Sequence, residues 1–97
     1  MLFAVRFHDK PGQLDLRSAH LQAHLDWIAR HSDAILIAGS LREMAEADPV
    51  GGLWIVQASD RSEVEILLQS DPFWIEGLRE SVEIHSWHRA FDKPVTI

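Results

Sequence analysis

Histidine is the side chain that most clearly offers chemistry here, since six occur among 97 residues and three share one segment. His20, His24 and His31 stand at positions i, i+4 and i+11, and Trp27 at i+7 completes the line. At about 100° per residue, His24 lies about 60° from Leu21 around a helix axis, at the border of an apolar stripe. Such rings can form one wall of a cleft, or cover the core edge with their polar tips in water. In a cleft, an imidazole can act as a general acid or base near neutral pH.

Other catalytic chemistries lack their residues. His20 and His24 have the spacing of a helical metal site, but Leu21 replaces the glutamate of the metalloprotease motif and any third ligand is distant. With no cysteine, disulfides, thiolate metal sites and cysteine nucleophiles are excluded. Gly51-Gly52 precedes a strand rather than a helix, and no P-loop or G-x-S-x-G motif is present. The sequence therefore predicts neither a metal nor a cofactor.

Asp71 is the most informative carboxylate. It follows a helical segment, precedes Pro72, and is flanked by Phe73 and Trp74. A carboxylate among aromatic residues tends to be desolvated unless it is paired. It can equally be a structural cap, held by backbone N–H groups of the turn that Pro72 opens. Local sequence leaves both roles open.

Composition and charge exclude several classes of partner. Acidic residues outnumber basic ones by 15 to 9, for a formal charge of −6, so a basic surface for nucleic acid or an anionic membrane is absent. The first ten residues, MLFAVRFHDK, contain no secretory apolar region, and no apolar run approaches the ~20 residues of a membrane span. We expect one cytoplasmic domain, residues 1–97.

The hydrophobic pattern predicts four strands and two helices. In the first helix, Leu21, Leu25 and Ile28 are expected to form the buried stripe, with Asp15 as N-cap. The second begins with a capping-box spacing at Asp60, and Pro72 can open a short further turn. The strands are predicted at residues 2–8, 34–40, 53–58 and 81–91, the helices at about 16–31 and from 60 to the Asp71-Pro72 break, and the largest loop at 42–52.

The order βαββαβ predicts an α+β, ferredoxin-like fold: a four-stranded antiparallel sheet with two helices on one face. The strands nevertheless carry apolar residues on both faces, Leu53 and Ile55 on one side and Trp54 and Val56 on the other. A second copy packed sheet to sheet would cover the remaining face. We therefore predict a homodimer.

Short pieces along nearly the whole chain together resemble one known family. They are Asp9-Lys10-Pro11-Gly12, Arg17, His24-Leu25, Gly39-Ser40-Leu41, Gly51-Gly52, Asp71-Pro72-Phe73, Gly77 and Trp87. In this order and spacing the chain resembles the YciI-like (YCII-related) proteins. The resemblance implies a dimeric α+β barrel and a His–Asp pair at the active site, which fall here on His24 and Asp71.

Two positions depart from the family pattern. Ser40 stands where proline commonly follows the glycine, which is expected to alter the floor of the pocket. His20 stands where arginine is common, so a contact to an anionic substrate is expected to be weaker or pH-dependent. Arg17 could hold a carboxylate or phenolate.

The resulting hypothesis is a cofactor-independent enzyme that transfers protons through His24 and Asp71, giving elimination or isomerisation of a small cyclic or aromatic metabolite. Two alternatives stay open. The chain could bind a small molecule without catalysis, as a sensor or carrier, or serve as an accessory oligomerisation module. The 42–52 loop is expected to shape access to the site.

Overall fold

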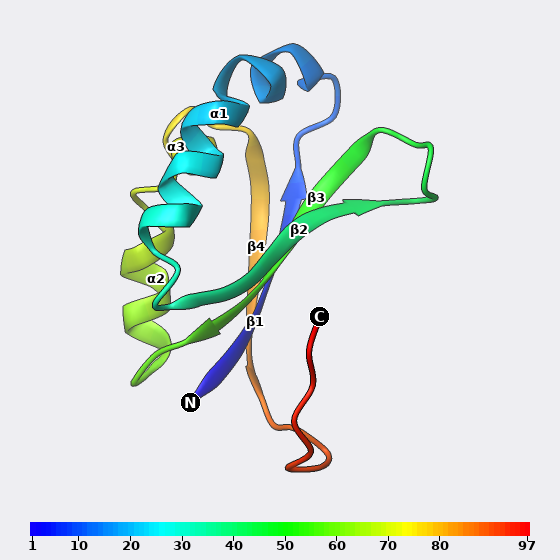
Figure 1. Cartoon of the computed structure of the whole chain (residues 1–97). Helices are drawn as coiled ribbons and strands as arrows, with labels where there is room; N and C mark the ends of the chain where they lie inside the picture. Colours follow the sequence, from blue (N-terminus) through cyan, green and yellow to red (C-terminus); the bar gives the residue numbers. More distant parts are fainter.

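The computed structural model describes residues 1–97 as one antiparallel sheet with helices packed against one of its faces (Figure 1). The predicted α+β, ferredoxin-like arrangement is confirmed, with a third, one-turn helix where Pro72 was expected to open a turn. The elements are β1 (Leu2–Asp9), α1 (Leu14–Arg30), β2 (Ile35–Arg42), β3 (Pro49–Gln57), α2 (Arg61–Leu68), α3 (Pro72–Ile75) and β4 (Arg79–Trp87).

The sheet order is β2-β3-β1-β4, and every neighbouring pair is antiparallel. β1 lies at the centre, between β3 and β4, so the first strand of the chain pairs with its last. The two crossovers that this order requires place the helices on one side of the sheet, as Figure 1 shows. No helix is long and apolar enough to cross a membrane.

The core fills the space between the sheet and the helices. In β1 the buried residues alternate with less buried ones, because successive side chains of a strand point to opposite faces. The same alternation in β3 brings Trp54 against the ring of Phe7, with ring centroids 4.5 Å apart. The buried hydrophobic residues that form this cluster are Phe3, Val5, Phe7, Trp27, Ile35, Trp54, Val56, Val64, Leu68 and Ile84.

The buried face of α1 differs from the predicted one. Leu21 and Leu25 are exposed, whereas His24 and Trp27 are the buried residues of this helix. The Trp27 ring lies against the Trp54 ring, with centroids 5.5 Å apart, and its Nε1 donates a hydrogen bond to Ser70 Oγ at 3.1 Å. The buried face of α1 thus lies about one residue position around the helix axis from the leucine stripe, because a tryptophan buries more area than a leucine.

The N-terminus of α1 was also predicted wrongly. Gln13, not Asp15, occupies the N-cap position, and no side chain caps the helix there. Asp15 lies instead in the first turn, where a negative charge interacts favourably with the helix dipole. The predicted cap of α2 is confirmed, since the Asp60 side chain accepts from the backbone N–H of Glu63 at 3.0 Å.

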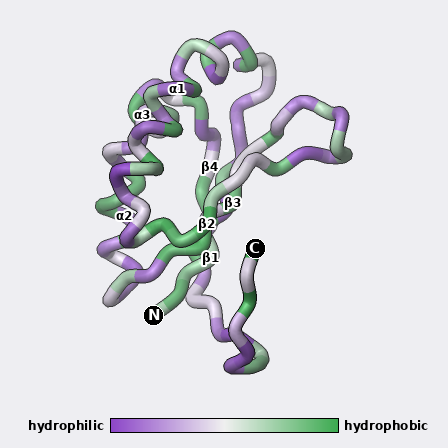
Figure 2. The backbone as a smooth tube through the Cα atoms, viewed as in Figure 1, coloured by the Kyte–Doolittle hydropathy of each residue, from purple (hydrophilic) through white to green (hydrophobic).

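The connection between β2 and β3 is shorter than predicted. The two strands continue pairing as far as Arg42 and Pro49, so only residues 43–48 form the loop, in which three acidic residues alternate with Met and Ala (Figure 2). Gly51 and Gly52 therefore lie inside β3. A Cβ atom at Gly51 would come within 2.0 Å of the Phe7 carbonyl oxygen, so the neighbouring strand β1 requires glycine there.

The sheet face away from the helices remains partly apolar. Ile37 and Leu53 are 37% and 38% exposed on it, and together with Leu41 and Ile55 they line a shallow apolar hollow. This agrees with the prediction that the strands carry apolar residues on both faces.

Candidate active site

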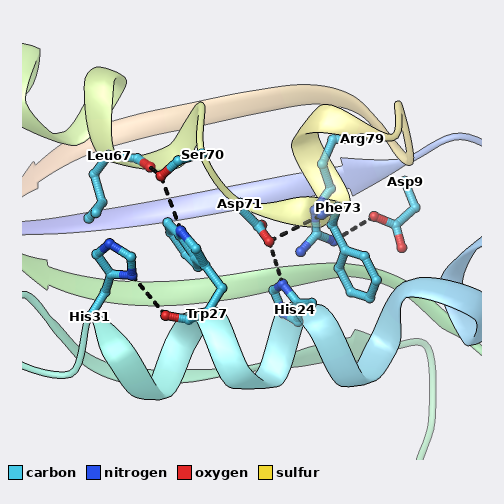
Figure 3. A network of polar contacts seen from close by, with 9 residues as sticks. All are labelled: Asp9, His24, Trp27, His31, Leu67, Ser70, Asp71, Phe73 and Arg79. Carbon is cyan, nitrogen blue, oxygen red and sulfur yellow. Dashed lines mark hydrogen bonds and ion pairs between the residues drawn. The ribbon is translucent and has the colours of Figure 1, made fainter.

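His24 and Asp71 form a buried pair between α1 and the start of α3 (Figure 3). The distance from His24 Nδ1 to Asp71 Oδ1 is 2.7 Å, and the Asp71 side chain is fully buried. Asp71 Oδ1 also accepts from the backbone N–H of Phe73 at 3.1 Å, because Asp71 is the N-cap of α3. The sequence left open whether Asp71 caps a turn or is paired; in the structure its Oδ1 atom does both.

The ring of His24 is fixed on a second side. It stacks on the Phe73 ring with centroids 4.0 Å apart and an angle of 12° between the planes. An ionised carboxylate only accepts hydrogen bonds, so Asp71 favours the tautomer with a proton on Nδ1. Nε2 has no partner within the protein and is not enclosed. Its lone pair is therefore available to take a proton from a molecule beside it.

A cavity of ≈ 250 Å³ lies beside this pair, bounded by α1, β2, β3 and the start of β4. One wall is apolar, since the side chains of Leu21, Leu25 and Ile28 line it; the two leucines are exposed and Ile28 is half-buried. This accounts for Leu21 and Leu25, which face the cavity rather than the core, whereas Ile28 also packs against the core. The polar lining residues are Arg17, His24, Ser40, Arg42 and Arg79.

Two of the three residues predicted to contact substrate line this cavity. Arg17 and Ser40 do so, and the Ser40 hydroxyl accepts from Arg42 Nε at 3.2 Å. His20 is not among the lining residues, and its Nε2 lies 3.7 Å from a carboxylate oxygen of Glu76. Of the two histidines of α1, His24 therefore lines the cavity and His20 does not.

Arg42 and Arg79 are the polar lining residues that were not predicted from the sequence, and Arg79 is the buried one. Its side chain is buried, with Nη1 2.7 Å from Asp9 Oδ1. The guanidinium lies against two rings, 4.5 Å from the centroid of Phe7 and 5.1 Å from that of Phe73. Gly52 leaves room for it, because a Cβ there would be 3.3 Å from Arg79 Nη2.

Strand alternation could not have found Arg79. Val82 and Ile84 face the helices, so a regular strand would also turn Glu80 inward. The register between β1 and β4 shifts after His8, however, and Asp9 pairs with Arg79. This irregularity buries Arg79 and leaves Glu80 exposed. The feature of the sequence that could have indicated a buried Arg79 was Asp9, a residue of opposite charge at the end of β1.

Arg17 shares the same carboxylate. Its Nε lies 3.3 Å from Asp9 Oδ2, and its guanidinium is 5.2 Å from the Phe73 ring centroid. Burial lowers the pKa of Arg17, and the charge of Asp9 opposes this effect. No group of three or more histidine, aspartate or glutamate side chains is arranged to hold a metal ion.

Comparison with known proteins identifies relatives of this chain. Residues 1–88 match the YCII-related domain family. No curated protein sequence matches the chain. Among solved structures it is similar to 5-chloro-2-hydroxyhydroquinone dehydrochlorinase (TftG) from Burkholderia phenoliruptrix AC1100, in complex with 2,5-dihydroxybenzoquinone, with 26% identity and a TM-score of 0.85 over 93% of this chain and 96% of that one.

More distant structures share the fold alone. Protein Atu4242 from Agrobacterium tumefaciens is 22% identical, with a TM-score of 0.56 over 99% of this chain and 100% of its own. TTHA0845 from Thermus thermophilus is 19% identical, with a TM-score of 0.55 over 96% of this chain and 100% of its own.

Proposed function

Since this chain belongs to the YCII-related domain family, we propose that it is a cofactor-independent enzyme that transfers protons on a small cyclic or aromatic metabolite. The observation that carries this proposal is the His24–Asp71 pair, 2.7 Å apart, with the free Nε2 beside a cavity. A carboxylate behind an imidazole orients the ring and stabilises the imidazolium that forms on proton uptake. Catalysis by such a general base contributes typically about 10²–10⁴-fold in rate.

The proposed step balances without an oxidant or reductant. His24 Nε2 takes a proton from the substrate, and the electron pair left behind forms a new π bond. In an elimination from a hydroxylated aromatic ring, the imidazolium first returns the proton to the carbon that carries chlorine, which gives a keto tautomer. His24 Nε2 then takes a second hydroxyl proton, and the electron pair forms the second carbonyl as chloride leaves. In an isomerisation the imidazolium returns the proton at another carbon. Asp71 remains ionised throughout and holds Nδ1–H.

The similarity to TftG supports a ring with hydroxyl or carbonyl oxygens as the first substrate to try. That protein is named for dehydrochlorination of 5-chloro-2-hydroxyhydroquinone, and its structure holds 2,5-dihydroxybenzoquinone. The apolar wall formed by Leu21, Leu25 and Ile28 suits a flat ring of this kind.

The test is turnover by His24→Gln and Asp71→Asn, measured as chloride release from 5-chloro-2-hydroxyhydroquinone and as proton exchange with related hydroxyquinones. We expect each variant to lose about 100-fold or more in rate while keeping its fold. His88→Gln makes the same exchange at an exposed histidine and should leave the rate unchanged. A folded His24→Gln variant with the rate of the unmodified protein would refute the proposal. A ligand that raises Tm without being consumed would favour a binding protein instead.

A homodimer is part of the same proposal. The open sheet face supports it, because Ile37, Leu53 and Ile55 lie there without covering helices. Two copies packed through these faces would bury apolar surface that the single chain leaves in water.

A further inference from the structure

Helix α1 is joined to the corner between α2 and α3 at two neighbouring points (Figure 3). His24 Nδ1 lies 2.7 Å from Asp71 Oδ1, and Trp27 Nε1 donates a hydrogen bond to Ser70 Oγ at 3.1 Å. His24 and Trp27 are three residues apart and therefore lie on one face of the helix, while Ser70 and Asp71 are consecutive. The second bond thus attaches to α1 the residue directly before the Asp71 carboxylate.

The donor and acceptor roles in this second bond are fixed by chemistry. An indole N–H only donates, and a serine hydroxyl carries a single hydrogen. Ser70 Oγ donates that hydrogen to the Leu67 carbonyl oxygen at 3.1 Å, near the end of α2, and therefore accepts from Trp27. The hydroxyl is held in one orientation and connects α1 to the end of α2.

The indole that holds Ser70 is itself fixed by packing. Trp27 is 3% exposed, and its ring lies 5.5 Å from that of Trp54 in the core and 4.4 Å from that of His31, measured between centroids. His31 Nδ1 donates to the Trp27 carbonyl oxygen at 2.8 Å, which keeps the histidine ring in its place. A side chain packed to this degree does not follow small movements of a neighbouring corner, so its N–H is a fixed point for Ser70.

The Asp71 carboxylate depends on such a fixed point. Its Oδ1 serves both His24 and the Phe73 N–H, and its Oδ2 is buried without a partner. The following helix α3 has only four residues, and Pro72 at its start has no N–H to offer. Hydrogen bonds weaken steeply as their angle closes, so the position of the corner decides how firmly Asp71 keeps a proton on His24 Nδ1.

We propose that Trp27 and Ser70 are positioning residues for the His24–Asp71 pair. Their hydrogen bond holds Asp71 where it keeps His24 in the tautomer with a proton on Nδ1 and with Nε2 free. The consequence for the reaction rate rests on the proposed function, whereas the tautomer is a property of the protein without substrate. Ser70 is exposed, so its contribution comes through Trp27 rather than through burial of its own side chain.

Long-range ¹H–¹⁵N NMR of the histidine rings at pH 8.5 tests this proposal, because protonated and unprotonated ring nitrogens differ widely in ¹⁵N shift. The His24 signals are those missing from His24→Gln. In the unmodified protein we expect a protonated Nδ1 and an unprotonated Nε2. In Ser70→Ala and in Trp27→Phe, which keeps a ring but has no N–H, the two shifts should move towards each other as the tautomers mix.

Turnover should follow the tautomer. In Ser70→Ala we expect kcat for chloride release from 5-chloro-2-hydroxyhydroquinone to fall about 10- to 100-fold with KM unchanged, since a slightly misplaced catalytic group costs rate rather than binding. Ser70→Thr keeps the hydroxyl and should restore both the rate and the tautomer. Ser32→Ala removes a hydroxyl at an exposed position just after α1 and should change neither.

The same His24 tautomer in Ser70→Ala as in the unmodified protein would overturn the proposal. Ser70 is exposed, so this variant keeps the test decisive if Trp27→Phe does not fold. The two measurements also separate this proposal from the proposed function. If the tautomer changes in Ser70→Ala but the unmodified protein turns over no hydroxyquinone, the catalytic proposal fails and the positioning of the pair stands. If the unmodified protein is active and Ser70→Ala matches it in tautomer and rate, the positioning role fails and the catalytic proposal stands.

Discussion

A single carboxylate performs two tasks at the centre of this molecule. Asp71 Oδ1 caps α3 through the Phe73 N–H and also accepts from His24 Nδ1. Oδ2 is buried without a partner, so the residue is costly to bury and is kept in place by its first oxygen. The cap fixes the carboxylate, the carboxylate fixes the imidazole tautomer, and the Phe73 ring fixes the imidazole plane.

This double role predicts that two substitutions of Asp71 separate folding from catalysis. Asp71→Asn keeps an oxygen for the cap and the same volume, and should change the free energy of unfolding little while reducing turnover. Asp71→Ala removes the cap and leaves His24 Nδ1 without a partner, and should cost about 2 kcal/mol or more. Urea unfolding of the two variants at pH 7 measures the difference. Equal stability of the two variants would show that the cap contributes nothing.

The sequence predicted the pair, with Arg17 and Ser40 beside it, but not Arg79. Asp71 and His24 came from family resemblance, and the spacing of His24 beside the leucine stripe agreed with a cleft. Arg79 and the role of Asp9 were missed because a register shift between β1 and β4 turns Arg79 inward, against strict alternation. Such irregularities depend on pairing between distant segments, which periodicity within one strand does not contain.

At the scale of elements, the fold was largely predictable and the rotation of α1 was not. Strand alternation correctly separated Trp54 and Val56 from Leu53 and Ile55, and in the structure Trp54 and Val56 are the buried pair. In α1 the apolar stripe is real, but its leucines line a cavity and the core receives Trp27 and His24 instead. Hydrophobicity alone cannot distinguish a surface that faces the core from one that faces a binding site.

The glycines of β3 provide an element-scale prediction. A Cβ at Gly51 would meet the backbone of Phe7 at 2.0 Å, which cannot move aside, whereas one at Gly52 would meet Arg79 Nη2 and the Gly39 carbonyl at 3.3 Å. Gly51→Ala should therefore prevent folding. Gly52→Ala should cost about 1–3 kcal/mol. Gly39→Ala meets nothing within 4 Å and is the matched control. Thermal unfolding by circular dichroism ranks the three, and a Gly51→Ala variant as stable as Gly39→Ala would contradict the strand packing.

The cap of α2 makes stability depend on pH. The backbone N–H of Glu63, and then the Ser62 hydroxyl, hold the pKa of Asp60 below its ordinary value. The unfolded chain therefore takes up this proton first, near the reference value of about 3.9, and the contribution of the cap is lost as pH falls through the lower folded pKa. Asp60→Asn cannot ionise, so its urea midpoint should fall less between pH 5 and about 2 than that of the unmodified protein. Parallel curves for the two proteins would exclude this contribution.

At the scale of the whole molecule, the open sheet face connects the small size of the chain to its proposed assembly. A domain near 100 residues buries a modest share of its surface on folding. The exposed apolar residues on one sheet face are surface that a second copy of the chain can bury. The cavity lies on the opposite side of the sheet, among α1 and the helix-facing residues Trp54 and Arg79. Pairing through the open face therefore leaves the proposed site accessible from the helix side.

This geometry predicts that a charge on the open face separates the two copies. Leu53→Glu puts a carboxylate on that face, beside Ile37 and Ile55 and opposite Arg6, where packing against another copy would remove the charge from water. In analytical ultracentrifugation the unmodified protein should sediment as a dimer and Leu53→Glu as a monomer with unchanged circular dichroism. Ile66→Glu places the same charge at a 69% exposed position of α2, on the helix side, and should remain dimeric. If the unmodified protein is monomeric at high concentration, or if Leu53→Glu remains a dimer, the copies do not pair through this face, and the apolar residues of β2 and β3 are simply tolerated in water.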